Sequence, residues 1–96
     1  RIIVNAVALA DDLELLHRIQ NGEEAAFEGI FQRYYPVLVG FARRMLADLE
    51  LAEEAVQDVF VVFWEKKDGL VIQQSLKSYL FASVYHKCLR HTRHQK

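Results

Sequence analysis

Three carboxylates and an amide surround one exposed valine in the stretch 52–67, AEEAVQDVFVVFWEKK. At 100° per residue, the apolar side chains of this stretch gather on one side, and a second face spans roughly 140° to 240° from Ala52. This second face holds Glu54, Gln57, Asp58, Val61 and Glu65. An apolar centre with a polar rim is typical of a protein docking site, whereas a single exposed valine is also common on ordinary surfaces. The pattern leaves both interpretations open.

Basic and aromatic side chains repeat along the C-terminal segment. Two aromatic residues four positions apart precede a basic residue at every third position: Phe81 and Tyr85, then Lys87, Arg90, Arg93 and Lys96. Basic groups can follow a phosphate backbone, and aromatic rings can stack on unpaired bases. Alternatively, the two rings extend the contact with the core and the charges are only solvated. Single-stranded nucleic acid is therefore one candidate ligand of this segment.

The formal net charge of −1 conceals a division of charge along the chain. All 13 Asp and Glu residues lie between Asp11 and Asp68, where the net charge is −7. From Gly69 to Lys96 there is no acidic residue, and five Lys and Arg residues give +5. Such an asymmetry indicates two partners of opposite character, with nucleic acid as the candidate partner of the basic end.

The sequence gives little support for catalysis or for a bound metal ion. Glu14 and His17 have the E-x-x-H spacing of di-iron bundles, but those bundles need two such motifs, and the chain has one. No Gly-rich phosphate loop and no nucleophile–base motif occurs. The single cysteine, Cys88, excludes an internal disulfide and fits a reducing cytoplasm. We expect no enzyme activity, no cofactor and no metal site.

Helices must position these residues, because no segment has a convincing strand pattern. Capping residues and apolar periodicity predict four helices: from Asp11 or Asp12 to about Gln20, from about Glu23 to Ala47, over about 49–67, and from a Ser75 cap to about His94. Asp48 is expected to cap the third helix, and Pro36 to kink the second. The segment between the third and fourth helices is expected to be a loop.

Each predicted helix has one apolar stripe that we expect to be buried. The stripes are Leu13, Leu16 and Ile19; Phe27, Ile30, Phe31, Tyr34, Leu38, Phe41, Ala42 and Met45; Ala52, Ala55, Val56, Val59, Phe60, Phe63 and Trp64; and Leu76, Tyr79, Leu80, Ser83, Val84 and Cys88. The sequence thus predicts an all-α bundle of about four helices over residues 11–96.

Residues 1–10 read as a poorly specified leader. This segment is far shorter than the roughly 20 residues of a membrane span, and we expect no membrane insertion.

Three stretches, in this order and spacing, resemble region 2 of the extracytoplasmic-function (ECF) sigma factors, the promoter-recognition subunits of bacterial RNA polymerase. They are AAFEGIFQRYYPVLVGFARRML, AEEAVQDVFVVFWEKK and SLKSYLFASVYHKCLRHTR. The resemblance covers about Asp11 to Lys96 and implies a transcription initiation factor of the sigma-70 family. It also admits an anti-sigma factor as a partner. The second domain of this family, which reads the upstream promoter element, is not expected within these residues.

The resemblance implies a role for the third helix and another for the segment that follows it. In the family, the third helix docks on the clamp helices of the largest polymerase subunit, which implies core-polymerase contacts at Glu54, Gln57 and Asp58, around Val61. The next loop and the fourth helix correspond to the reader of the promoter minus-ten element, which melts the duplex and holds an unstacked base of the nontemplate strand. The implied DNA-binding residues are Tyr79, Phe81, Tyr85, His86, Lys87, Arg90 and Arg93.

Two positions depart from the family pattern. Family members commonly have Asn at the position of His86, and Asp or Asn at the position of Arg90, so the promoter sequence cannot be read from these residues. Two other classes of protein also fit the residues themselves. One is a helical protein-interaction module with a solvated basic tail, and the other is a helix-turn-helix regulator that reads duplex DNA.

Overall fold

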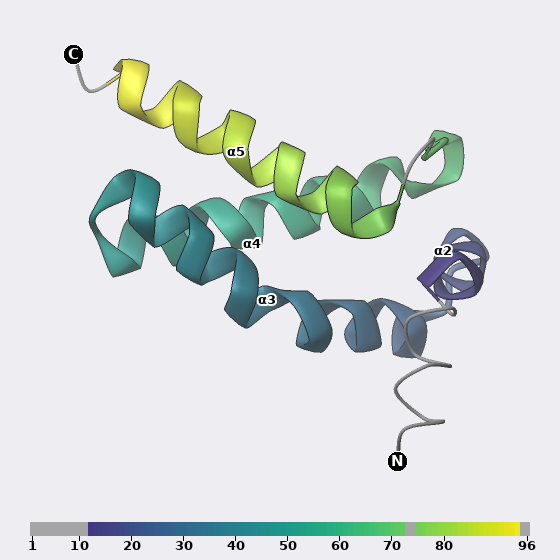
Figure 1. The fold of residues 1–96 in the computed structure, drawn as a ribbon. Coiled ribbons are helices and arrows are strands. Elements are labelled where there is room, and N and C mark those ends of the chain that lie inside the picture. Colours follow the sequence, from purple (N-terminus) through teal and green to yellow (C-terminus); the bar gives the residue numbers. More distant parts are fainter. Residues whose placement is uncertain (1–11, 73–74, 95–96) are drawn as a thin grey trace.

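The computed structural model describes residues 12–72 and 75–94, with the backbone alone at 93 and 94. Within these residues the chain forms four α-helices and one short 3-10 turn, without a strand (Figure 1). The elements are α2 (Asp12–Gln20), α3 (Glu24–Leu46), α4 (Leu49–Lys66), the 3-10 turn η1 (Lys67–Gly69) and α5 (Leu76–His94). The predicted all-α bundle is confirmed, and the predicted helix ends differ from these by a residue at most. The predicted leader lies outside the described residues.

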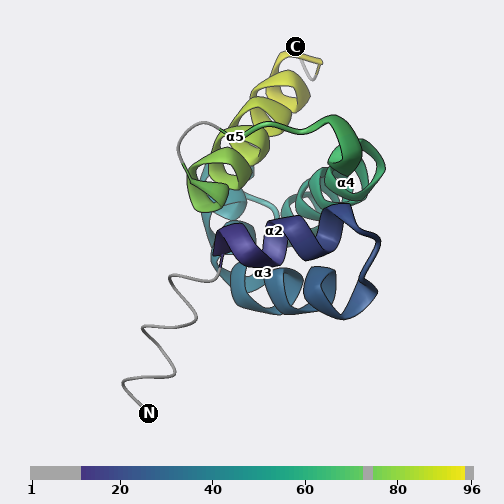
Figure 2. The same cartoon turned by 90° about the vertical axis from the view of Figure 1, so that its right-hand side faces the viewer.

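Three long helices and one short helix share a single core. Figure 1 shows α3 and α4 running in opposite directions, with α5 lying over both. Figure 2 shows α2 crossing the first part of α3, and α2 also contacts η1 and α5. No helix of the described residues is long and apolar enough to cross a membrane.

Capping side chains set the starts of two helices. The Asp48 carboxylate accepts a hydrogen bond from the Leu51 amide at 3.0 Å, and the Ser75 hydroxyl oxygen accepts one from the Ser78 amide at 3.0 Å. Both bonds satisfy amides that have no partner within the helix, and both predicted caps are confirmed. Ala47 ends α3 in the left-handed region, with φ at 56°.

Every member of the predicted stripes is buried or partly buried, with one exception. The partly buried members are Phe27, Phe31, Phe41, Met45, Trp64, Tyr79 and Ser83. Leu16 and Ile19 of α2 are buried, but Leu13 is 54% exposed, so its predicted burial is wrong. The reason is the rotation of α2 about its axis. The Asp12 side chain accepts hydrogen bonds from Arg33 and Tyr34 of α3, and this contact extends the inward stripe from Leu16 and Ile19 back to Asp12. Leu13 therefore points away from α3.

Pro36 lies inside α3 and removes one backbone donor from that helix. Figure 1 shows α3 changing direction part-way along its length, which agrees with the predicted kink. Before the proline, Phe27 packs on Phe60 and Trp64 of α4. After it, Phe41 meets Phe81 of α5, with ring centroids 5.3 Å apart.

Candidate protein and nucleic-acid interfaces

The helix α4 has one buried face and one exposed face, as its periodicity predicts. The buried residues are Ala52, Ala55, Val56, Val59, Phe60 and Phe63, and Trp64 packs at the edge of the core. Glu54, Gln57, Asp58, Val61 and Glu65 are all exposed. Val61 is 54% exposed, and its neighbour Val62 is 41% exposed, so the apolar centre of this face is wider than the single predicted valine.

An apolar groove runs along one edge of this face, between α3 and α4. It has a volume of about 420 Å³ and is lined by Phe27, Phe31, Gln57, Phe60, Val61, Trp64 and Glu65. Aromatic rings form its floor: the Phe27 and Trp64 centroids lie 5.0 Å apart, edge to face. The Gln57 side-chain amide donates to the Tyr35 hydroxyl of α3 at 3.2 Å. This hydrogen bond holds Gln57 on the side of the exposed face that adjoins α3.

A charged groove runs along the opposite edge, between α4 and α5. It has a volume of about 330 Å³ and is lined by Asp58, Val59, Val62, Lys66, Tyr79, Ser83, His86, Lys87 and Arg90. The Lys87 ammonium lies 3.3 Å from the Asp58 carboxylate, and both side chains are partly exposed. Lys66 and Arg90 add positive charge that Asp58 alone does not balance. This groove can therefore attract an anion such as a phosphate.

The structure separates the predicted polymerase contacts into two groups. Gln57 and Val61 line the apolar groove, whereas Asp58 lines the charged groove and pairs with a residue predicted to bind DNA. Glu54 is exposed on the face between them. Asp58 is therefore the position at which the two predicted surfaces meet.

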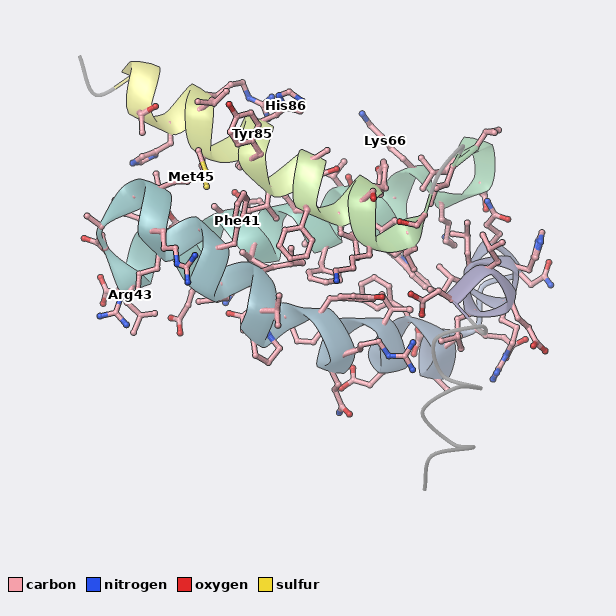
Figure 3. All side chains as sticks on the ribbon, in the orientation of Figure 1. Phe41, Arg43, Met45, Lys66, Tyr85 and His86 are labelled. Atoms are coloured by element: carbon pink, nitrogen blue, oxygen red, sulfur yellow. The ribbon has the colours of Figure 1, made fainter. Side chains whose placement is uncertain are left out.

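The aromatic residues predicted to bind DNA have different surroundings. Tyr85 is 44% exposed, and its ring centroid lies 5.5 Å from that of His86. Phe81 packs edge to face on Phe41, and Tyr79 lies with its ring centroid 6.0 Å from that of Phe63. Figure 3 shows Phe41 pointing from α3 towards α5, whereas His86 points from α5 away from α3. Phe81 thus extends the core contact, and Tyr79 contacts the core and also lines the charged groove. Tyr85 presents an exposed ring surface.

The predicted basic residues lie along α5 as far as the structure describes them. Lys87 and Arg90 line the charged groove, and Arg93 lies in the last turn of α5, with its side chain outside the described residues. Lys66 of α4 was not among the predicted site residues. Figure 3 shows it extending from α4 on the side where α5 lies. Asp58, Val62 and Lys66 follow one another at four-residue spacing along one face of the helix. This spacing could have identified Lys66 as a site residue.

The chain matches the family described as Sigma-70 region 2 over residues 30–96, which is more than half of its length. The match includes all of α4 and α5 and most of α3. No curated protein and no solved structure matches the chain. The chain therefore belongs to the sigma-70 region 2 family, the non-enzymatic domain with which sigma factors bind core RNA polymerase and promoter DNA in transcription initiation.

Proposed function

We propose that the chain is region 2 of an ECF sigma factor, in which α4 contacts core RNA polymerase and α5 with its preceding loop binds the minus-ten element. The ECF assignment rests on the resemblance of the three stretches in α3, α4 and α5. The observation that carries the two helix roles is the difference between the grooves on either side of α4. One groove is aromatic and apolar, and the other is lined mainly by charged and polar side chains.

In this proposal, the exposed face of α4 binds the clamp helices of the largest polymerase subunit. Val61 and the aromatic groove supply the apolar centre of the contact, and Glu54, Gln57 and Asp58 supply its polar rim. Interfaces of this kind obtain most of their affinity from a few central apolar or aromatic contacts, whereas the rim excludes water and fixes the orientation. The buried side of α4 is packed into the core, so this contact does not require the bundle to open.

Nontemplate DNA is proposed to lie along α5 and the charged groove. Lys66, Lys87 and Arg90 line this groove and would contact phosphates, with Arg93 continuing the basic stripe. The exposed ring of Tyr85, beside His86, would stack on a base. Phe81 and Tyr79 would support α5 through their core contacts. Extruding a base costs roughly a few kcal/mol of stacking and pairing, which such contacts can offset without covalent chemistry.

Co-purification with core RNA polymerase tests the role of α4. Asp58→Arg reverses one charge of the rim, and we expect it to weaken binding to core polymerase and to an isolated clamp-helix fragment by at least about tenfold. Glu14→Arg is a matched control, because it makes the same charge change on an exposed residue of α2. Circular dichroism should be unchanged in both variants. Polymerase binding by Asp58→Arg that equals that of the control would contradict the proposal.

Fluorescence anisotropy with short oligonucleotides tests the role of α5. We expect tighter binding to single-stranded oligonucleotides of mixed sequence than to the same sequences as duplexes, with an affinity that falls steeply as salt is added. Tight binding to duplex DNA with weak binding to single strands would instead support a major-groove reader.

A further inference from the structure

We propose that Gln20 is a positioning residue for residues 67–72, the described part of the loop that follows α4, which it holds in the conformation used for DNA binding. Gln20 is the last residue of α2 and precedes the segment 30–96 that matches the family. The inference rests on the proposed function, because it takes that loop to be part of the DNA-binding surface.

One side-chain amide of Gln20 bonds to both ends of the turn that follows α4. Its Nε2 donates to the backbone carbonyl of Lys67 at 3.1 Å and to that of Leu70 at 3.0 Å. An amide nitrogen carries two N–H groups, so both donors are used. The two bonds join residues that are 47 and 50 positions apart in the sequence, and they are partly buried, where water competes less for the carbonyls.

These bonds act on a short turn of the backbone. The turn η1 is a single 3-10 turn, closed by a bond from the Leu70 amide to the Lys67 carbonyl at 3.3 Å. Beyond it, Leu70 and Ile72 pack against the core, whereas Val71 between them is 81% exposed. The bond from Gln20 holds the Leu70 carbonyl, directly before the exposed Val71.

The position of Gln20 is set by the core and not by the loop. Leu16 and Ile19 of the same helix are buried, and the Asp12 carboxylate accepts hydrogen bonds from Arg33 and Tyr34 of α3. Burial, together with the bond to Asp12, raises the pKa of Tyr34 to about 12, so this hydroxyl keeps its donor proton at any ordinary pH. The helix α2 is thus a fixed support that carries the Gln20 amide to the loop.

A second contact holds the start of the same turn. The Lys67 ammonium lies 4.1 Å from the centroid of the Trp64 ring and donates to the Trp64 carbonyl at 3.3 Å. Trp64 is the single tryptophan of the chain, so its fluorescence reports on this end of the turn.

A loop that is ordered before binding does not have to be ordered by its ligand. Loss of both bonds from Gln20 would leave two partly buried carbonyls without these donors and allow the loop to adopt other conformations. The loss of these bonds would then weaken DNA binding more than it lowers the stability of the bundle, because the helices keep their own contacts. This difference separates a positioning role from a purely structural one.

The test compares Gln20→Glu and Gln20→Leu with Gln32→Glu. Gln20→Glu keeps the size of the side chain and removes its donors, and Gln20→Leu removes its polarity without adding charge. Gln32→Glu is the matched control, since it makes the same charge change on an exposed side chain of α3 that bonds to Glu28. We measure binding to single-stranded oligonucleotides of mixed sequence by anisotropy, amide hydrogen exchange over residues 67–72, and Trp64 fluorescence.

Both Gln20 variants should bind the oligonucleotides about five- to tenfold more weakly, and the control should change less than about twofold. Amide exchange over 67–72 should accelerate and Trp64 fluorescence should shift in the Gln20 variants, with exchange in the middle of α3 and α4 unchanged. If the unsubstituted chain binds but the Gln20 variants bind equally well, or if their loop exchange is unchanged, the role of Gln20 is overturned and the proposed function stands. Failure of the unsubstituted chain to bind single strands would overturn both.

Discussion

The two grooves beside α4 belong to the same helix and differ in nearly every chemical respect. The groove towards α3 has a floor of aromatic rings, and its one side-chain hydrogen bond among the described contacts joins two neutral groups, Gln57 and Tyr35. The groove towards α5 contains the Asp58–Lys87 ion pair and the further cations Lys66 and Arg90. Val61 lines the first groove and Val62 the second, so adjacent residues of one helix face different surroundings.

This difference shows how one short domain can serve two kinds of partner. An apolar groove beside carboxylates suits a protein surface, where affinity depends on burying rings and aliphatic groups. A groove with an excess of cations suits a phosphate backbone, where affinity depends on charge and falls with salt. The two kinds of groove thus lie on opposite sides of a single helix.

The largest expected effect is that of a charge placed in the apolar groove. Val61→Arg should weaken binding to core polymerase by about 30-fold or more, because it places an unpaired charge at the centre of the proposed contact. Binding to single-stranded oligonucleotides should change by less than about threefold. Val37→Arg on α3 is the control, since Val37 is 55% exposed and lies in neither groove. If Val61→Arg weakened binding to core polymerase and to single-stranded oligonucleotides equally, the two grooves would not have different partners.

An intermediate effect should separate the two aromatic residues of α5. Phe81→Ala removes a ring that packs on Phe41 and should lower the free energy of unfolding by about 2 kcal/mol, measured by urea denaturation. Tyr85→Ala removes an exposed ring and should change stability by less than about 0.5 kcal/mol while weakening single-strand binding by about 1 kcal/mol or more. A Tyr85 variant that binds normally would remove this ring from the proposed DNA surface.

The smallest expected effect lies at the ion pair that joins the two surfaces. Asp58→Asn removes the carboxylate beside Lys87 without changing the size of the side chain, and should raise single-strand affinity by about twofold at low salt. The gain is small because both partners are partly exposed and screened by solvent. The same variant should bind core polymerase more weakly. If Asp58→Asn raised both affinities or lowered both, Asp58 would not mark a boundary between the two surfaces.

The sequence predicted the local features of the fold because each depends on a few neighbouring residues. Asp48 and Ser75 fixed the starts of their helices, and the spacing of apolar residues identified the buried face of α4. It also identified Val61 as an exposed residue among carboxylates. The fold class followed from the same signals, since periodic segments with short connections leave few arrangements other than a helical bundle.

Periodicity could not predict the features that depend on how one helix packs against another. The exposure of Leu13 follows from the contact of Asp12 with α3, and the division of the α4 face follows from the approach of Lys87 to Asp58. The bonds from Gln20 to the loop join residues that are far apart in the sequence, and no local signal marks them. The sequence thus identified residues that line both grooves, but it could not assign each residue to its groove.

We propose that the grooves on the two sides of α4 bind core polymerase and DNA at the same time. The most direct measurement is the affinity of the chain for core RNA polymerase in the absence of DNA and at a saturating concentration of a single-stranded oligonucleotide. We predict that the oligonucleotide leaves polymerase binding unchanged or strengthens it, and that a ternary complex forms. Displacement of polymerase by the oligonucleotide would show that both partners share one surface and would contradict this account.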